Sequence, residues 1–235
     1  SSDVCSSDLE EMNKKFRYGM SDLANGAVYL RSEYNPGNKA LEFNPKKAQE
    51  LLAKAGWADA DKNGVLEKTI NGKKTEFKFT LIYPNKDVEK YYTMYREDLK
   101  KAGIDMELKY LEWNSFLKLV DDGKFDAVTM AWGGGSVDPD PKQIWHSSSA
   151  VAGGSNFINY KNPEVDKLID EARVEPNKAK RVKLLKEVYK KIADDAPYAF
   201  LFNDKYDFYA NSSRMGQPGE TFRYDIGKEY WWLKP

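Results

Sequence analysis

The sequence predicts an α/β fold in which a mostly parallel sheet is covered by helices. Three strand-like segments, 76–84, 104–111 and 125–132, alternate with helical segments at 86–102 and 113–122. This βαβαβ order is typical of parallel sheets, because a crossover helix joins each strand to the next. The 235 residues are enough for a sizeable core. The net charge of zero, from 37 basic and 37 acidic residues, argues against a nucleic-acid binder.

The segments before the first strand predict two helices. Residues 10–26 indicate a helix that ends near Asn25-Gly26. Asn44 is a favourable N-cap and Pro45 suits the first helical position, so a second helix is expected to begin there. Gly56 is expected to stop it.

Within the alternating region, the helix that begins at residue 86 is expected to end at Gly103. The segment 125–132 (FDAVTMAW) is apolar, which predicts a strand in the middle of the sheet.

The carboxyl-terminal third continues with helices and then strands. One or two helical turns are expected at 141–148, and Asn162-Pro163 predicts the start of another helix. Residues 178–195 form a long amphipathic pattern, whose basic residues fit a solvated helix face. Residues 196–203 and 205–211 are predicted strands.

The loop AWGGGSVDPDP (131–141) directly follows a predicted parallel strand. Ligands of such sheets bind beyond the carboxyl ends of the strands, so this loop lies where a site is expected. It lacks the Lys-Ser/Thr of a P-loop and the glycine spacing of a dinucleotide site, which argues against phosphate binding. Two interpretations remain open, a tight exit from the strand and a close approach of ligand backbone.

Polar residues in and after this loop raise the question of catalysis. Asp138 and Asp140 have the residue type of paired catalytic acids, but each precedes a proline, which favours turn and cap roles. His146 is the only histidine and has no G-x-S-x-G nucleophile motif to serve. It is interpreted as a packed residue of a short helix.

Residues 59–64 (DADKNG) match the start of a calcium loop, D-x-[DN]-x-[DN]-G. The twelfth position of such a loop should be a bidentate Glu, and here it is Ile70. Glu67 would have to substitute with another geometry. The segment 59–68 is interpreted as a carboxylate-rich turn, with calcium binding as the alternative, and a second turn is expected around Asn71-Gly72.

The first nine residues, SSDVCSSDL, resemble the conceptual translation of a sequencing-adapter oligonucleotide, so residues 1–9 are interpreted as non-native. Cys5, the sole cysteine, then carries no functional meaning. No apolar run approaches the ~20 residues of a transmembrane helix.

The ordered motifs of the chain resemble the carboxyl-terminal part of a family 5 extracellular solute-binding protein, the oligopeptide- and dipeptide-binding class of ABC-importer receptors. The resemblance runs from about residue 10 to the end, and its motifs are FNPKKAQELLAKAGW (43–57), DADKNGVLEK (59–68), LKKAGIDMELKYLEWNSFLKLVDDGKFDAVTMAWGGGSVDPDP (99–141), IWHS (144–147), NFINYKNPEVDKLIDEAR (156–173) and KEVYKKIADDAPYAFLF (186–202).

This resemblance implies a type II periplasmic-binding-protein-like lobe of a two-lobed receptor that closes on its ligand. Residues 10–42 would be a helix and linker to a missing amino-terminal lobe, 43–204 the ligand-binding lobe, and 205–235 a return to the other lobe. The hinge return is expected near 203–210. It also implies a monomer without cofactor, metal or enzymatic activity. Such a receptor would lie in the periplasm or outside the cell, with lipid anchoring an open alternative, and would serve a membrane permease.

The resemblance further implies which residues line the cleft: Trp132, Gly133, Gly134, Gly135, Ser136, Asp138 and Trp145. Many peptide-binding relatives carry an aspartate that pairs with the peptide's amino terminus, and Gly135 stands at that position here. An oligopeptide is the expected ligand. The alternatives are a sugar, an opine-like compound or a metal chelate. The rival classes are a hydrolase using Asp138 and Asp140, and a structural domain that binds no small solute.

Overall fold

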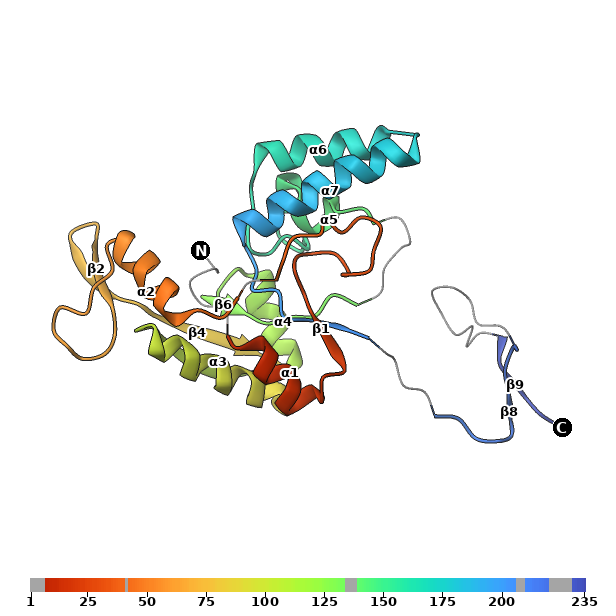
Figure 1. Cartoon of the computed structure of the whole chain (residues 1–235), viewed down its shortest axis with the longest axis horizontal. Helices are drawn as coiled ribbons and strands as arrows, with labels where there is room; N and C mark the ends of the chain where they lie inside the picture. The colour runs from red at the N-terminus through yellow and green to blue at the C-terminus, as the bar shows by residue number, and fades with distance from the viewer. Residues whose placement is uncertain (1–6, 41, 134–138, 206–209, 220–229) are drawn as a thin grey trace.

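The computed structural model describes residues 7–40, 42–133, 139–205, 210–219 and 230–235. Its helices and strands confirm the α/β fold with a parallel, helix-covered sheet (Figure 1). None of the helices in these ranges combines the length and apolarity that a membrane span requires. The helices are α1 (Leu9–Arg17), α2 (Pro45–Lys54), η2 (Lys86–Val88), α3 (Glu89–Lys101), α4 (Trp113–Asp121), α5 (Lys142–Trp145), η3 (Ser147–Ser149), α6 (Pro163–Val174) and α7 (Lys178–Asp195).

The strands form four small sheets within the described residues. Their members are β1 (Ser21–Leu23), β2 (Glu67–Ile70), β3 (Lys73–Glu76), β4 (Lys78–Tyr83), β5 (Asp105–Tyr110), β6 (Ala127–Val128), β7 (Phe202–Asp204), β8 (Met215–Gly216) and β9 (Trp232–Leu233).

The parallel sheet has the order β5-β4-β6. Its register runs from Lys78 opposite Asp105 to Tyr83 opposite Tyr110. The prediction that 125–132 is the central strand is wrong, because β6 is a two-residue edge strand and β4 lies in the middle. The burial explains this order: β4 ends in three consecutive buried residues, whereas both residues of β6 are only half-buried.

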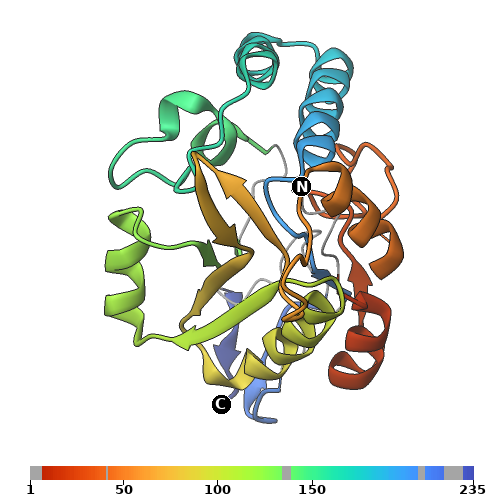
Figure 2. The same ribbon diagram turned by 90° about the vertical axis from the view of Figure 1, so that its left-hand side faces the viewer.

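Helices cover both faces of this sheet, as Figure 2 shows. Leu81 and Ile82 are neighbours in β4 and point to opposite faces. Leu81 packs in a core with Leu52 of α2 and Leu99 of α3. Ile82 packs in a separate core with Phe116 of α4. One layer of helices therefore packs on each face of the sheet, and neither layer is formed by the carboxyl ends of its strands.

A separate group of helices consists of α5, α6 and α7, with α6 and α7 running side by side (Figure 1). Asn162 caps α6 by accepting hydrogen bonds from the backbone of Glu164 and Val165. Ile169 and Ile192 are fully buried between these helices. The predicted bounds 178–195 agree with α7.

The amino-terminal helix ends earlier than predicted. It stops at Arg17, because Tyr18 adopts a left-handed conformation with φ 53° and Gly19 follows with φ 71°. The expected end near Gly26 is therefore wrong. The chain instead forms β1, which pairs antiparallel with β7 near the carboxyl end.

The remaining strand predictions meet mixed outcomes. Of the predicted strand 196–203, only its last two residues belong to β7. The prediction for 205–211 falls largely on residues 206–209, outside the described ranges. The turn at Asn71-Gly72 is confirmed: both residues have positive φ, 51° and 76°, and they connect β2 to β3 as a two-residue hairpin.

Candidate functional site

The carboxyl edge of the parallel sheet carries a group of aromatic side chains. Tyr83 and Tyr110 end β4 and β5 opposite each other, and Trp132 follows β6. Tyr110 and Trp132 are 41% and 46% exposed, so both rings present apolar surface to solvent. We call this group the aromatic edge; its members are Tyr83, Tyr92, Tyr110, Trp113, Trp132 and Phe157.

Trp132 lies flat on Phe157, with ring centroids 5.5 Å apart and planes 7° from parallel. Phe157 in turn packs against the core that contains Phe116 and Ile82. Burial raises the pKa of the nearby Tyr198 hydroxyl, and the indole N–H of Trp132 lowers this pKa again in part. The indole is therefore held from one side and exposed to solvent on the other.

Tyr83 joins the aromatic edge to α3. Its hydroxyl donates a 2.6 Å hydrogen bond to Glu89, and its ring lies 5.2 Å from that of Tyr92. Burial, followed by the nearby Glu89 carboxylate, raises the pKa of Tyr83 to about 12. The hydroxyls of Tyr92 and Thr129 are 3.1 Å apart, which ties α3 to the segment after β6. These contacts fix the strand ends that present the exposed rings.

The predicted glycine site is only partly described. Gly133 is exposed, and a Cβ atom placed on it would meet nothing within 4 Å. Crowding within the described residues therefore does not explain this glycine. Gly134, Gly135, Ser136 and Asp138 lie outside the described residues.

Trp145, the remaining predicted cleft residue, is only 3% exposed. Its ring packs against those of Tyr198, at 4.7 Å, and Tyr160, at 5.8 Å. It belongs to the core of α6 and α7. This burial argues against direct contact with a solute. Trp145 instead packs against Tyr198, whose hydroxyl pKa the indole N–H of Trp132 influences.

Asp140 and His146 occupy structural positions. One Asp140 oxygen accepts a hydrogen bond from the backbone of Lys142, and the other accepts one from Arg173, at 3.0 Å each. His146 is buried; its Nδ1 accepts from the backbone of Ser148, and its Nε2 lies 3.4 Å from Asp170. The interpretation of His146 as a packed residue is confirmed, but its placement within a short helix is wrong, because His146 has extended backbone between α5 and η3.

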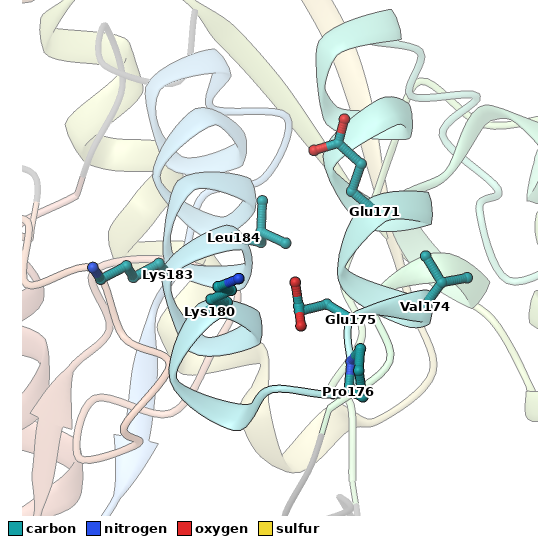
Figure 3. A pocket seen from close by; sticks show the side chains of 7 residues that line it. All are labelled: Glu171, Val174, Glu175, Pro176, Lys180, Lys183 and Leu184. Carbon is teal, nitrogen blue, oxygen red and sulfur yellow. The ribbon is translucent and has the colours of Figure 1, made fainter.

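A surface hollow lies at the turn between α6 and α7, and none of its lining residues belongs to the aromatic edge (Figure 3). Val174, 80% exposed, and Leu184 supply its apolar part. Four charged side chains surround them, and the complete lining is Glu171, Val174, Glu175, Pro176, Lys180, Lys183 and Leu184.

A second polar feature lies at the opposite end of the sheet, before β4. In the described residues, one oxygen each from Asp59, Asp61 and Glu67 lie within 4.8 Å of one another, close enough to share a metal ion.

The sequence prediction missed most of the aromatic edge. Tyr83 and Tyr110 are the last residues of their strands, so the rule that placed a site after β6 also points to them. Phe157 carried no comparable signal, because its contact with Trp132 depends on the path of the intervening loop.

Comparison with known proteins identifies the family of this chain. A family model described as "Bacterial extracellular solute-binding proteins, family 5 Middle" matches residues 6–154. The oligopeptide-binding protein AppA of Bacillus subtilis is 35% identical over 200 residues, which are 82% of this chain and 35% of AppA. Di/tripeptide-binding protein 1 of Pseudomonas aeruginosa is 27% identical over 76% of this chain and 32% of its own length.

Solved structures of binding proteins also match the fold of this chain. AppA in complex with a nonapeptide superposes with a TM-score of 0.82 and 30% identity, over 100% of this chain and 47% of that one. An oligopeptide-binding protein of Thermotoga maritima with bound mannohexaose gives a TM-score of 0.74 and 25% identity, over 87% of this chain and 41% of that one. The chain thus spans less than half the length of these relatives, and their fold confirms the predicted type II binding-protein lobe. This chain belongs to the bacterial extracellular solute-binding proteins of family 5.

Proposed function

We propose that this chain supplies one wall of the binding site of a receptor that captures an oligopeptide and delivers it to the permease of an ABC importer. The observation that carries the proposal is the exposed indole of Trp132, stacked on Phe157 at the carboxyl edge of the parallel sheet. Ligands of open α/β sheets bind at this edge. AppA, named as an oligopeptide-binding protein, matches across the same region.

The aromatic edge suits the capture of chemically varied peptides. Large rings give apolar contact area at low cost in conformational entropy, because they have few rotatable bonds. A peptide held along its main chain, with its side chains in hydrated spaces, is bound with little dependence on sequence. We therefore assign Trp132 and Gly133 to direct ligand contact, together with Gly134, Gly135, Ser136 and Asp138.

A receptor of this kind needs a hinge, and the β1–β7 pair is the part of the chain that suits this role. Ser21 lies opposite Asp204, so segments from the two ends of the chain meet there. This position supports the expected hinge return near 203–210. We keep the division into a linker at 10–42, a ligand-binding lobe at 43–204 and a return segment at 205–235.

The proposed role requires no chemistry on the solute. Asp140, one of the two carboxylates that a hydrolase would use, is committed to Lys142 and Arg173. We propose a monomeric receptor in the periplasm or outside the cell, with a lipid anchor as the alternative to free diffusion.

A non-peptide solute is the second candidate. Gly135 offers no side chain at the position where peptide-binding relatives carry an aspartate, and the T. maritima relative binds mannohexaose. A sugar or metal chelate would use the same aromatic edge, because sugar rings also pack on indole faces.

Mass spectrometry of solute that co-purifies with the chain, followed by calorimetry with the identified compound, tests the proposal. Trp132→Ala should weaken binding about tenfold or more, as expected for an aromatic anchor. Val174→Ala is the control at an apolar residue outside the proposed site, because Val174 is 80% exposed and lies at the α6–α7 turn. Equal binding by Trp132→Ala and the unmodified chain contradicts the assigned site, and turnover of the solute contradicts the receptor class.

A further inference from the structure

The loop between α2 and β2 wraps its backbone around acidic side chains. Asp59 accepts hydrogen bonds from the backbone N–H groups of Asn63 and Gly64, each at 3.0 Å. Asp61 accepts a second bond from Asn63 at 3.2 Å. These contacts draw Asp59 and Asp61 toward Glu67 at the start of β2, so that one oxygen of each lies within 4.8 Å of the others.

Glu67 supplies an independent sign that something is bound here. Its side chain is only 8% exposed. Oε1 accepts a hydrogen bond from the backbone of Ala60, but Oε2 is buried and has no hydrogen-bond partner among the described residues. A buried carboxylate oxygen without a partner is costly, so such an atom indicates a missing cation or donor.

Lys74 neutralises only part of this cluster. Its Nζ lies 2.7 Å from Asp61 and 3.2 Å from Oε1 of Glu67. Three carboxylates and one ammonium group leave two negative charges. The Lys74 side chain is 54% exposed and stands on β3 of a hairpin, so it is free to turn outward when a stronger cation arrives.

We propose that Asp59, Asp61 and Glu67 form a calcium site in which Ca²⁺ replaces the ammonium group of Lys74. Oxygen ligands about 2.3–2.6 Å from one ion lie at most about 5 Å apart, and the three carboxylate oxygens, all within 4.8 Å of one another, are close enough to share one such ion. Ile70, at the twelfth loop position, lies in β2 and supplies no carboxylate. Glu67, at the ninth position, provides the buried carboxylate instead.

The same geometry selects Ca²⁺ over Mg²⁺. Ca²⁺ accepts six to eight oxygens in variable arrangements, and water completes a site with few protein ligands. Mg²⁺ demands a nearly ideal octahedron and gives up its water reluctantly. The bound ion would tie the loop to the β2–β3 hairpin at the amino end of β4, away from the aromatic edge, so the site does not depend on the proposed function.

Terbium luminescence tests the site, because Trp57 lies two residues before Asp59 and serves as the sensitiser. The full 235-residue chain is titrated with Tb³⁺ and then with Ca²⁺ and Mg²⁺ as competitors. We expect competition by Ca²⁺ with a dissociation constant on the order of 0.1–1 mM, and weaker competition by Mg²⁺.

Two variants of opposite sign sharpen the test. Glu67→Gln removes the buried charge and should weaken Ca²⁺ binding by about tenfold or more, whereas Lys74→Met removes the competing cation and should strengthen it by about tenfold. Asp122→Asn is the matched control, since Asp122 pairs with Lys124 on the surface of a different loop. Circular dichroism checks that each variant is folded.

Calorimetry without Tb³⁺ decides the outcome. Heat of Ca²⁺ binding that disappears in Glu67→Gln and persists in Asp122→Asn supports the site. Absence of Ca²⁺ binding up to about 10 mM in both the unmodified chain and Lys74→Met overturns the proposal. A Ca²⁺ concentration of about 10 mM is well above the largest dissociation constants of extracellular calcium modules, about 1 mM.

Discussion

Trp132 and Phe157 are 25 positions apart, yet their rings stack with centroids separated by 5.5 Å and planes 7° from parallel. Phe157 also contacts the core of α4 and β4. The exposed indole is thus connected through one ring to the buried part of the sheet. A binding surface held in this way loses little further conformational freedom when a ligand arrives.

This arrangement predicts that Phe157→Ala weakens solute binding through Trp132. We expect a loss of about three- to tenfold, because an aromatic pair contributes roughly 0.5–1.5 kcal/mol beyond its buried area. Calorimetry on Phe157→Ala, Trp132→Ala and the double variant gives the coupling between them. The double variant should bind about as weakly as Trp132→Ala alone. Independent, additive losses would show that Phe157 does not act by positioning Trp132.

The residue at position 135 predicts how the proposed receptor would treat a peptide's amino terminus. A charge-assisted bond to a carboxylate contributes roughly 1.5–3 kcal/mol, so its loss on acetylation would cost tenfold or more. With Gly135 at the anchor position, we expect a free peptide and its N-acetylated form to bind within about threefold of each other. Competition binding with the two forms measures this ratio.

The variant Gly135→Asp provides the converse experiment. It should create a preference for the free amino terminus, and Gly219→Asp, at an exposed glycine outside the proposed site, serves as the control. A large loss on acetylation in the unmodified chain would contradict the prediction, because it would require another anionic partner.

The sequence predicted the helices whose first residues are fixed by a capping side chain. Asn44 and Asn162 cap α2 and α6 through their own side chains, and the Asn-Pro pairs in the sequence identified both helix starts. β6 was placed wrongly because the apolar sequence of 125–132 does not reveal which strands pair, and among the described residues β6 pairs only with β4. β1 was missed because its three residues are stabilised by pairing with β7, more than 170 residues later.

For the candidate site, too, the sequence predicted its position in the fold but not the burial of each side chain. Its position at the carboxyl edge followed from the βαβ order, which is a topological rule. Trp145 was placed at the cleft on resemblance alone, yet its ring is buried against Tyr198. Burial depends on how α5 packs against α6, and no short sequence pattern encodes that contact.

Gly103, between α3 and β5, predicts a measurable effect on stability. Its φ is 82°, and an added Cβ would lie 2.7 Å from Cγ of Leu66. Gly64 has a similar φ of 88° with nothing within 4 Å of that position, so it is a matched control. Gly103→Ala should lower the free energy of unfolding by about 1 kcal/mol more than Gly64→Ala, since it adds crowding to the backbone strain. Urea unfolding of both variants measures the difference. Equal losses would show that Leu66 moves aside freely.

Tyr83 predicts how stability depends on alkaline pH. The pKa of Tyr83 is raised to about 12 by burial and by the Glu89 carboxylate, whereas an unfolded tyrosine has a pKa of about 10. The folded state therefore holds the proton more tightly. The protonated hydroxyl of Tyr83 therefore contributes to the free energy of unfolding. This contribution is fully present below about pH 10 and is lost as the pH rises toward about 12.

Replacing the hydroxyl tests this contribution to stability. Tyr83→Phe cannot ionise, so the free energy of unfolding should fall less steeply between about pH 10 and 12 than it does in the unmodified chain. Tyr18→Phe is the control, because the Tyr18 ring is 81% exposed. Urea unfolding, followed by circular dichroism across this range, gives both slopes. An unchanged slope in Tyr83→Phe would mean that Tyr83 ionises alike in the folded and unfolded chains, and that its bond to Glu89 does not hold the proton.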